Sequence, residues 1–551
     1  MHSKSTPVRR GFAAATFALA LSGCATAPAP TPATRPTGWA APETLVQPSA
    51  LHGVHGLAVD AKGRLLAGTV VGNDMWEVDR QTGKAKVFIA SPEGQADDIA
   101  IGPKGELAWT SYLQGVLRMR DNDGAATRVV AKDLPGINSL AFDQKNGKLY
   151  GSQVFLGDAL WEIDPSGQKP PRAIAKDLGG FNGFEVGPDG MLYGPLWFKG
   201  QLVRIDPANG AVTVINSGFK VPAAANLDGK GNLWAIDTKT GEVAKVNLAS
   251  GQKTVVTQLN TALDNLAISP EGTVYVSNMA DNAIIEVNPS TGQTKTLLSG
   301  KLAVAGGMKL GGGKLWIADT FAFRSIDVAT GEVRDIARMQ ASDIEYPAMV
   351  GMGSQQLALV SWFTNTVQLI DRKTLKTVDM VHGFKTPYDA IPMDDGSLLV
   401  IEIATGNLLR VSGAKHEKRK VIASGLTGPV QMVLGQDGQL YLTEAAGNLV
   451  RIDLATGVKT VVASGLAMPE GLAQTPWGSF IVAETLAARL TEVDLASGER
   501  RTVAENLPIG LEGGPGMPPP YNVTGVAVGS DGVIYMSADR NNAVYKIQPR
   551  R

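Results

Sequence analysis

The sequence has one cysteine, Cys24, among 551 residues, so no disulfide can form within a single chain. Acidic and basic residues are almost equal in number, 52 against 51, which leaves no basic excess to neutralise the phosphates of a nucleic acid. The sequence also lacks a Gly-x-Ser-x-Gly motif, a phosphate-binding Walker loop and a dinucleotide fingerprint. The few histidines disfavour a zinc or lyase site built from several of them: His2, His52, His55, His382 and His416.

Glycine is abundant, with 64 residues, and it recurs in a repeated unit that residues 181–215 illustrate. Residues 184–186, 191–193, 202–205 and 212–215 alternate in polarity as short strands do. The turns between them carry Gly, Asn and Asp, which tolerate the positive φ of tight hairpins. Each unit therefore predicts four antiparallel strands.

The same unit occurs twelve times, at spacings of 40 to 44 residues except for a last spacing of 54. Four-stranded units with this period are typical of β-propeller blades, so we expect an all-β protein. The copies begin near His55, Asp97, Asn138, Asn182, Ala223, Asp264, Gly306, Ala348, Asp389, Val430, Glu470 and Thr524. The chain length favours two tandem six-bladed propellers over one ring of twelve or rings of seven and five.

The last copy lacks a fourth strand, whereas residues 43–47 resemble one. We expect residues 43–290 to form the first propeller and residues 291–551 the second. In this arrangement strand 43–47 completes the blade that begins at Asp264, and strand 293–298 completes the blade that begins at Thr524. The alternative is that residues 288–292 form an ordinary hairpin. The boundary then moves to about residue 301, and strand 43–47 crosses to the second propeller.

The N-terminal residues predict a targeting signal rather than part of the folded structure. Arg9 and Arg10 precede an apolar run too short to span a bilayer, as in a signal peptide over residues 1–24. Leu21-Ser22-Gly23-Cys24 resembles a bacterial lipobox, which implies that Cys24 is lipidated and cannot serve as a nucleophile. Residues 25–42, rich in Ala, Pro and Thr, predict a tether. We therefore expect a monomer at the periplasmic face of the outer membrane, held there by its lipid anchor alone.

One position in each blade, the residue just before the inner strand, should reach one mouth of the central channel. In the first propeller this position supplies oxygen ligands from several blades, which suit a divalent cation and Ca²⁺ best. The predicted metal ligands are Asp97, Asn138, Asn182 and Asp264. The alternative is that these side chains only cap turns through hydrogen bonds to the backbone.

The strings Gly-Leu-Ala-Val-Asp, from residue 56, and Asn-Gly-Phe-Glu-Val-Gly-Pro-Asp-Gly, from residue 182, resemble the SMP-30/gluconolactonase/LRE superfamily. The NHL and virginiamycin B lyase-like propellers share the pattern. The resemblance implies a divalent metal held by Glu, Asn, Asn and Asp, and Asn138 and Asn182 match the two asparagines. His55 stands where the family has Glu, and Ala223 where it has Asp.

The second propeller is expected to gather negative charge at its own mouth, which would raise pKa values or require a cation. The residues are Asp389, Glu402, Glu444, Glu470 and Glu484. Aromatic side chains after the second strands, among them Tyr112, Trp197 and Phe198, can stack on a sugar or an aromatic ligand. The alternatives are solvated rim charge and packing between blades. The Gly- and Pro-rich insertion 507–521 is expected to cover the second mouth as a lid.

Three functional hypotheses follow. The first is a metal-dependent hydrolase of lactones or related esters, with Asp97, Asp264 or His55 as the base. The second is a non-catalytic propeller at the cell envelope that binds a small molecule, a protein or another envelope component. The third is a virginiamycin B lyase-like enzyme with an acid–base pair in the second propeller, joined by His382.

Overall fold

The computed structural model describes residues 34–551, and this part of the chain is all-β, as the repeat predicts. Its only helical segments are two short 3₁₀ turns, η1 (Tyr112–Gln114) and η2 (Thr485–Ala487). None of the helices in residues 34–551 is long and apolar enough to cross a membrane. The expected signal peptide, Cys24 and the first part of the tether lie outside the described residues.

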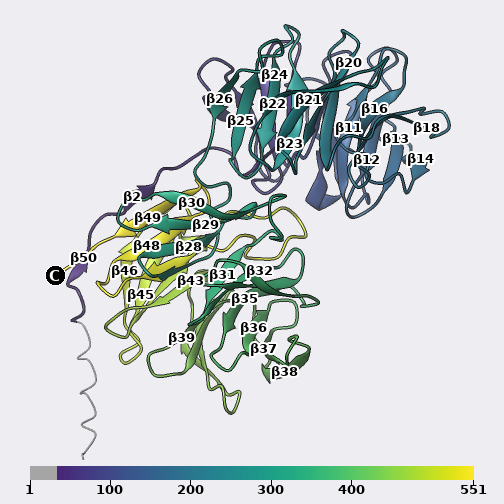
Figure 1. The fold of residues 1–551 in the computed structure, drawn as a ribbon. Coiled ribbons are helices and arrows are strands. Elements are labelled where there is room, and N and C mark those ends of the chain that lie inside the picture. The colour runs from purple at the N-terminus through teal and green to yellow at the C-terminus, as the bar shows by residue number, and fades with distance from the viewer. Residues whose placement is uncertain (1–33) are drawn as a thin grey trace, which may run out of the picture.

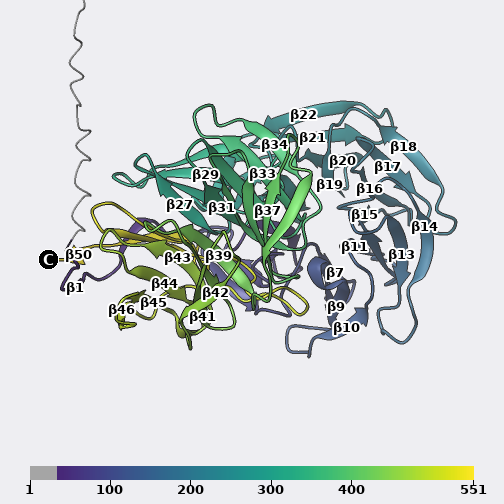
Figure 2. The same ribbon diagram turned by 90° about the horizontal axis from the view of Figure 1, so that it is seen from below.

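The strands form twelve four-stranded antiparallel sheets and one two-stranded sheet. The four-stranded sheets form two groups, which we call the N-lobe and the C-lobe; Figure 1 shows them apart, and Figure 2 shows them from below, where they partly overlap.

The N-lobe contains the following strands, given sheet by sheet: β3 (Val54–Val59), β4 (Leu65–Thr69), β5 (Met75–Val78), β6 (Ala85–Ile89); β7 (Ile99–Ile101), β8 (Leu107–Ser111), β9 (Val116–Arg120), β10 (Arg128–Ala131); β11 (Ile137–Phe142), β12 (Leu149–Gln153), β13 (Ala159–Ile163), β14 (Arg172–Lys176); β15 (Glu185–Val186), β16 (Leu192–Leu196), β17 (Gln201–Ile205), β18 (Val212–Asn216); β19 (Pro222–Leu227), β20 (Asn232–Asp237), β21 (Glu242–Asn247), β22 (Lys253–Gln258); β23 (Leu263–Ile268), β24 (Val274–Asn278), β25 (Ala283–Val287), β26 (Thr294–Leu298).

The C-lobe contains these: β27 (Met308–Gly311), β28 (Lys314–Ala318), β29 (Ala322–Asp327), β30 (Val333–Arg338); β31 (Met349–Met352), β32 (Gln356–Ser361), β33 (Thr366–Asp371), β34 (Thr377–Val381); β35 (Pro387–Pro392), β36 (Leu398–Glu402), β37 (Asn407–Ser412), β38 (Lys418–Ala423); β39 (Pro429–Leu434), β40 (Leu440–Glu444), β41 (Asn448–Ile452), β42 (Lys459–Ala463); β43 (Pro469–Gln474), β44 (Phe480–Glu484), β45 (Arg489–Val493), β46 (Arg500–Ala504); β47 (Val526–Val528), β48 (Ile534–Ala538), β49 (Ala543–Ile547) and β2 (Glu43–Val46). The two-stranded sheet pairs β1 (Gly38–Trp39) with β50 (Pro549–Arg550).

The inner strands of neighbouring sheets contact one another in a closed order within each lobe. In the N-lobe the order runs from β3 through β7, β11, β15 and β19 to β23, and β23 packs back on β3. In the C-lobe it runs from β27 to β47, and β47 packs back on β27. Each lobe therefore has a central axis lined by six inner strands.

The expected exchange of end strands is wrong. Strand β26 pairs with β25 in the N-lobe, and β2 pairs with β49 in the C-lobe. Asn288 and Gly292 make an ordinary hairpin: the Asn288 side chain accepts the N–H groups of Ser290 and Thr291, and Gly292 has a φ of +71°. A local hairpin costs less loop-closure entropy than a pairing with a distant strand. The alternative left open by the sequence is thus the one observed.

Adjacent sheets are connected by side chains on their inner strands. In five cases a side-chain oxygen in or just before one inner strand accepts a backbone N–H in or just before the next, at 2.7–3.2 Å. The five acceptors are Asp98, Glu185, Asp389, Gln431 and Glu470. These bonds satisfy N–H groups at the crowded axis, where water has little access.

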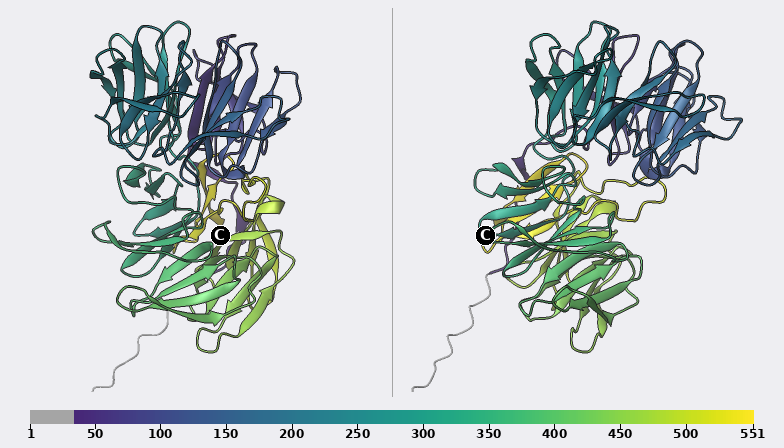
Figure 3. Two further views of the ribbon diagram at one scale, coloured as in Figure 1. Left: turned by 90° about the vertical axis from the view of Figure 1, so that its right-hand side faces the viewer. Right: turned by 45° about the vertical axis from the view of Figure 1, so that its right-hand side comes forward.

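The two lobes are docked through apolar and polar contacts. Phe321 and Met339 of the C-lobe pack with Met279 of the N-lobe in one buried cluster. Arg338 of the C-lobe pairs with Asp281 of the N-lobe at 2.7 Å. The buried Leu51 carbonyl, in the segment that crosses between the lobes, accepts hydrogen bonds from Asn282 of the N-lobe and Asn542 of the C-lobe. Figure 3 shows the lobes stacked on each other, with a loop of the C-lobe reaching toward the N-lobe.

Two connecting segments differ from the expectations. Residues 34–42, expected as part of a free tether, lie on the C-lobe: Arg35 pairs with Glu492, and Trp39 packs against Trp477. The insertion 507–521 bridges the lobes, because the Glu512 carbonyl accepts a hydrogen bond from Asn73 of the N-lobe.

Candidate functional site

The polar residues predicted at the channel mouth of the N-lobe lie at the start of the inner strands. His55, Asn138 and Asp264 fall within β3, β11 and β23, at positions where the pairing with the second strand shifts register. A β-bulge of this kind bends the strand and redirects a side chain. Asp97 and Asn182 lie just before β7 and β15. All five therefore face one cavity.

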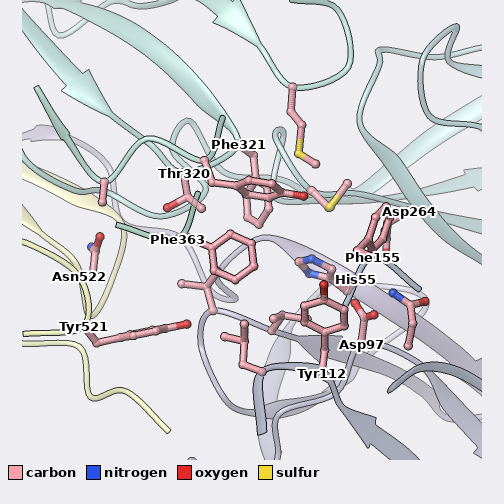
Figure 4. Close-up of a pocket in the computed structure, with 18 of the residues that line it drawn as sticks. His55, Asp97, Tyr112, Phe155, Asp264, Thr320, Phe321, Phe363, Tyr521 and Asn522 are labelled. Atoms are coloured by element: carbon pink, nitrogen blue, oxygen red, sulfur yellow. The ribbon is translucent and has the colours of Figure 1, made fainter. Parts of the chain in front are cut away.

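That cavity lies between the two lobes and encloses about 120 Å³. This is room for on the order of eight water molecules or for part of a small organic ligand. The N-lobe contributes the polar floor and the C-lobe covers it. The C-lobe residues are Thr320, Phe321, Met339, Tyr346, Ala348, Trp362, Phe363, Tyr521 and Asn522. Figure 4 shows His55 and Asp97 on one side of the space, and Phe321, Phe363 and Tyr521 across from them.

His55, Asp97 and Asp264 form the centre of the floor. One ligand atom from each lies within 4.8 Å of the other two, which is close enough to hold a metal ion. Burial, together with Asp264 and Asp98, raises the pKa of Asp97 well above its ordinary value. Burial and Asp98 raise the pKa of Asp264 to about 8. Without a cation these carboxyls retain protons near neutral pH.

The buried oxygen Asp97 Oδ2 has no hydrogen-bond partner among residues 34–551. Leaving a buried carboxylate oxygen unpaired is costly, so a partner from outside the chain is expected there.

His55 is arranged as a neutral ligand. Its Nδ1 lies 2.8 Å from the Gly53 carbonyl oxygen, which can only accept a hydrogen bond, so Nδ1 carries the proton. Its Nε2 therefore has a free lone pair. Burial lowers the pKa of His55 to about 4, which keeps the imidazole neutral at pH 7. A histidine oriented through its second nitrogen in this way is typical of metal sites.

Asn138 and Asn182, the other predicted ligands, line the same cavity. Their Oδ1 atoms lie 2.9 Å and 2.8 Å from the Ser139 hydroxyl. That hydroxyl has one proton, so it can satisfy only one of the two amide oxygens at a time. One asparagine oxygen thus remains available to a ligand in the cavity.

Two tyrosines from different lobes flank the floor. Tyr112 follows β8 in the N-lobe, and Tyr346 lies in the loop before β31 in the C-lobe. Burial raises the pKa of both phenols, and the nearby carboxyls Asp97 and Asp264 contribute. Both hydroxyls therefore keep their protons and can donate hydrogen bonds. Residues 34–551 provide no acceptor for either hydroxyl.

Three residues that line the cavity have a positive φ although they are not glycine. They are Phe155 at +69°, Thr320 at +44° and Tyr346 at +46°. Bulky and β-branched side chains rarely adopt this conformation, and such strain gathers at functional sites. The observation supports the cavity as a site independently of its charge.

An aromatic wall runs from the floor across the C-lobe. His55 contacts Phe321 at a centroid distance of 5.4 Å, and the contacts continue from Phe321 to Tyr346 and Phe363. Phe363 then contacts Trp362, which contacts Tyr521. Phe321, Trp362 and Phe363 belong to the aromatic side chains expected at a mouth after second strands. Their contact with the N-lobe floor was not predicted, because no feature of a single repeat indicates that the two lobes face each other there.

The predicted ligand-binding glutamates of the C-lobe are engaged elsewhere. Glu402, Glu444 and Glu484 each end a second strand and accept a backbone N–H from the loop before the inner strand of their own sheet, at Lys385, Thr427 and Ala467. Burial favours the neutral form of Glu444 and Glu484, but hydrogen bonds led by Lys459 and Arg489 outweigh it and lower both pKa values. These contacts engage each carboxylate within its own sheet, and none of the three lines the cavity between the lobes.

Asp389 and Glu470 lie nearer the C-lobe axis, but their oxygens are also satisfied. Asp389 accepts the N–H groups of Ala390 and Met432. Glu470 accepts the N–H of Thr524 and the hydroxyl of Thr485. Both therefore connect or stabilise sheets of the C-lobe.

Of the remaining predicted site residues, some line the cavity and others do not. Trp197 lines it, whereas Phe198 lies outside with 59% of its surface exposed and contacts Phe155. His382 is exposed and lines no part of the cavity, so the acid–base pair expected of a lyase loses its histidine. The insertion 507–521 does not cover a separate mouth of the C-lobe; its end, at Tyr521, covers the shared cavity.

Comparison with known protein families gives one match. Residues 108–265 and 225–388 match the model of DUF6923, a repeat of unknown function, and together they span just over half of the chain. The chain belongs to this repeat family. No curated protein matches the chain significantly.

Solved structures similar to this chain include the gluconolactonase XC5397 from Xanthomonas campestris, at 17% identity and a TM-score of 0.36, over 43% of this chain and 86% of that one. The extracellular domain of BT4673 from B. thetaiotaomicron is 10% identical, with a TM-score of 0.32 over 94% and 84%. A streptogramin B lyase is 14% identical, with a TM-score of 0.25 over 59% and 93%. At these TM-scores the likenesses carry no argument about activity.

Proposed function

We propose that the chain is a metal-dependent hydrolase of lactones or related esters, and that the cavity between the lobes is its active site. We also propose that each lobe is one six-bladed propeller, because six inner strands contact one another in a closed order in each. The observation that carries the function is the buried group His55, Asp97 and Asp264, within 4.8 Å of one another. The orphaned Asp97 Oδ2 supports a cation at this group, because it has no hydrogen-bond donor among residues 34–551.

The donor set favours a different metal from the one the sequence suggests. Ca²⁺ prefers six to eight oxygen ligands. One imidazole nitrogen and two carboxylates instead suit a transition metal such as Zn²⁺ or Mn²⁺. His55, Asp97 and Asp264 would hold the ion, with Asn138 or Asn182 as a further oxygen donor. When bound, such an ion supplies Lewis acidity, which polarises a carbonyl and makes water more acidic.

The chain's own residues supply the rest of the chemistry. The side chain of Asp97 has a second oxygen that can take a proton from an attacking water. The hydroxyls of Tyr112 and Tyr346 can donate hydrogen bonds to the carbonyl oxygen of a substrate as it gains charge. Phe321 and Tyr521, both largely buried, exclude bulk water above the floor, which strengthens these interactions.

The test is metal content and hydrolysis measured on the same samples. The protein is stripped with a chelator, reloaded with Zn²⁺, Mn²⁺ or Ca²⁺, and assayed with γ-butyrolactone and phenyl acetate. We expect one transition-metal ion per chain and activity that returns only on reloading. Stoichiometric metal without any hydrolysis would instead favour the second hypothesis, a propeller that binds a small molecule without converting it.

The anchor remains part of the proposal. Residues 34–42 pack on the surface of the C-lobe. A lipid on Cys24 would therefore hold the C-lobe, rather than the cavity, nearest the membrane. In a Cys24→Ser variant we expect no labelling by fatty acid and no membrane fraction. Unchanged labelling would refute the anchor without affecting the site.

A further inference from the structure

The cavity divides into a polar floor and apolar walls. The acidic residues and most of the other polar side chains come from the floor: His55, Asp97, Asn138, Asn182 and Asp264. The C-lobe adds one amide, Asn522, whose Nδ2 donates to the Ala305 carbonyl. The walls are formed mainly by aromatic, methionine and valine side chains, including Val70, Val71, Met279 and Met339. A polyol such as a sugar lactone would bury several hydroxyls against these walls, where polar partners are few, which is costly. The walls therefore suit an apolar group attached to a polar end.

The cavity is covered on one side only. Over the sheet of β3 and the sheet of β23, the mouth is closed by Phe321 and Met339, which pack against Met279. Over the sheets of β11 and β15, by contrast, the loops after the second strands face solvent. Phe155 lines the cavity and is also 45% exposed, so it reaches from the interior to the surface.

An apolar surface continues outward from that opening. Leu156 is 53% exposed, Phe198 is 59% exposed, and the rings of Phe155 and Phe198 lie 5.7 Å apart, edge to face. Phe155, Leu156 and Phe198 together form what we call the apolar rim. Exposed apolar side chains that adjoin a ligand cavity often mark the path of the ligand. The positive φ of Phe155, +69°, holds its ring at the opening at a conformational cost.

We propose that the substrate, under the hydrolase function proposed above, is a lactone or ester with an apolar chain. Its carbonyl lies at His55, Asp97 and Asp264, and the chain leaves the cavity between the aromatic wall and the apolar rim. Both lobes then contribute to specificity, because the C-lobe supplies the aromatic wall and the N-lobe supplies the apolar rim.

The first experiment measures kcat/KM for γ-lactones of increasing length, from γ-butyrolactone to γ-nonalactone. Each buried methylene contributes about 0.8 kcal/mol, so kcat/KM should rise about two- to fourfold per carbon. Phe198→Ala and Leu156→Ala should flatten this slope at the longer members. Leu486→Ala is the matched control, because Leu486 is 77% exposed and does not line the cavity. A flat slope in the unmodified protein, or equal flattening by all three variants, would overturn the proposal.

The second experiment separates this proposal from the hydrolase itself. Binding of 2-alkyltetrahydrofurans, which have the ring and the chain but no carbonyl to hydrolyse, is followed by intrinsic tryptophan fluorescence. If no lactone is hydrolysed but affinity for the 2-alkyltetrahydrofurans rises about two- to fourfold per carbon, the proposed binding of an apolar chain is supported and the proposed hydrolase function is wrong. If glucono-1,5-lactone binds or reacts better than γ-nonalactone, the apolar proposal fails whatever the reaction.

Discussion

Both lobes place carboxylates at the start of inner strands, but they satisfy them differently. In the C-lobe, Asp389 and Glu470 accept backbone N–H groups of the next inner strand. In the N-lobe, Asp97 has a buried oxygen without a partner and lies beside Asp264 and His55. A buried carboxylate that accepts backbone N–H groups connects sheets, whereas one without donors requires a ligand. Whether a buried carboxylate has hydrogen-bond donors therefore distinguishes a structural residue from a candidate ligand-binding residue better than the number of acidic residues does.

The lobes also differ in how they close. The N-lobe builds every sheet from consecutive strands, while the C-lobe completes its last sheet with β2 from the other end of the chain. The largest effect is therefore expected from deleting residues 34–47. This leaves one edge of β49 without its partner strand β2, although β48 still pairs with the other edge. It also removes Val46, which is buried among the apolar residues of the C-lobe. In calorimetry we expect the C-lobe transition to fall by more than 10 °C, and the N-lobe transition to change by much less.

Val46→Asp is a second variant for the same question, because it retains the strand but buries a charge. If the N-lobe transition falls as far as that of the C-lobe in both variants, the lobes unfold as one unit and this contrast fails.

The next largest effect tests the unsatisfied carboxylate. We expect Asp97→Ala and His55→Ala to lose bound metal, while Asp389→Asn retains it, because the amide can still accept the Met432 N–H. A ligand at a thousand times its Kd stabilises the folded state by about 4 kcal/mol. Chelation should therefore lower the Tm of the N-lobe by roughly 10 °C. Elemental analysis and calorimetry check this; an Asp389→Asn variant without metal would contradict it.

A smaller effect follows from the satisfied carboxylates. Burial, with Asp539 nearby, raises the pKa of Glu470 to about 8. The folded state then binds this proton more tightly than the unfolded state, so the free energy of unfolding decreases as pH rises from about 4.5 to 8. We expect Glu470→Gln to remove part of this decrease and to raise the Tm at pH 8 by a few degrees.

Glu444 gives the opposite sign and serves as the control. Its pKa is lowered, so its ionised form stabilises the folded state above the unfolded pKa. Glu444→Gln should therefore lower the Tm at pH 8. Equal shifts of Tm in the same direction for Glu470→Gln and Glu444→Gln would contradict the opposite pKa shifts of the two carboxyls.

The smallest effect concerns the contact between the lobes. Arg338 pairs with Asp281 and donates to the Thr261 carbonyl and to Asn278 across the interface. Arg338→Ala should cost about 1–3 kcal/mol of docking free energy, seen as faster hydrogen exchange at residues 338–348. Arg334, exposed and paired with Glu332, is the control: Arg334→Ala should leave that exchange unchanged.

The sequence by itself determined the sheets and much of the floor. Each turn is specified by its own residues: Asn288 accepts a backbone N–H of its turn, and Gly292 adopts a positive φ. Because such turns recur at a regular spacing, the strands between them and the repeat period could be predicted from neighbouring residues. The repeat also indicated that His55, Asp97 and Asp264 would meet, because equivalent positions in neighbouring sheets converge on an axis. Their burial, which sets their pKa values, was not visible in the sequence.

The tertiary structure alone decided how the lobes combine. The same repeat is compatible with either assignment of strands 43–46 and 294–298, and the observed pairing of β2 with β49 and of β26 with β25 decides between them. Tyr346 and Phe363 cover the N-lobe floor because the lobes dock mouth to mouth, a long-range contact that no repeat encodes. Local turn chemistry is determined by neighbouring residues, whereas docking depends on surfaces assembled from residues hundreds of positions apart.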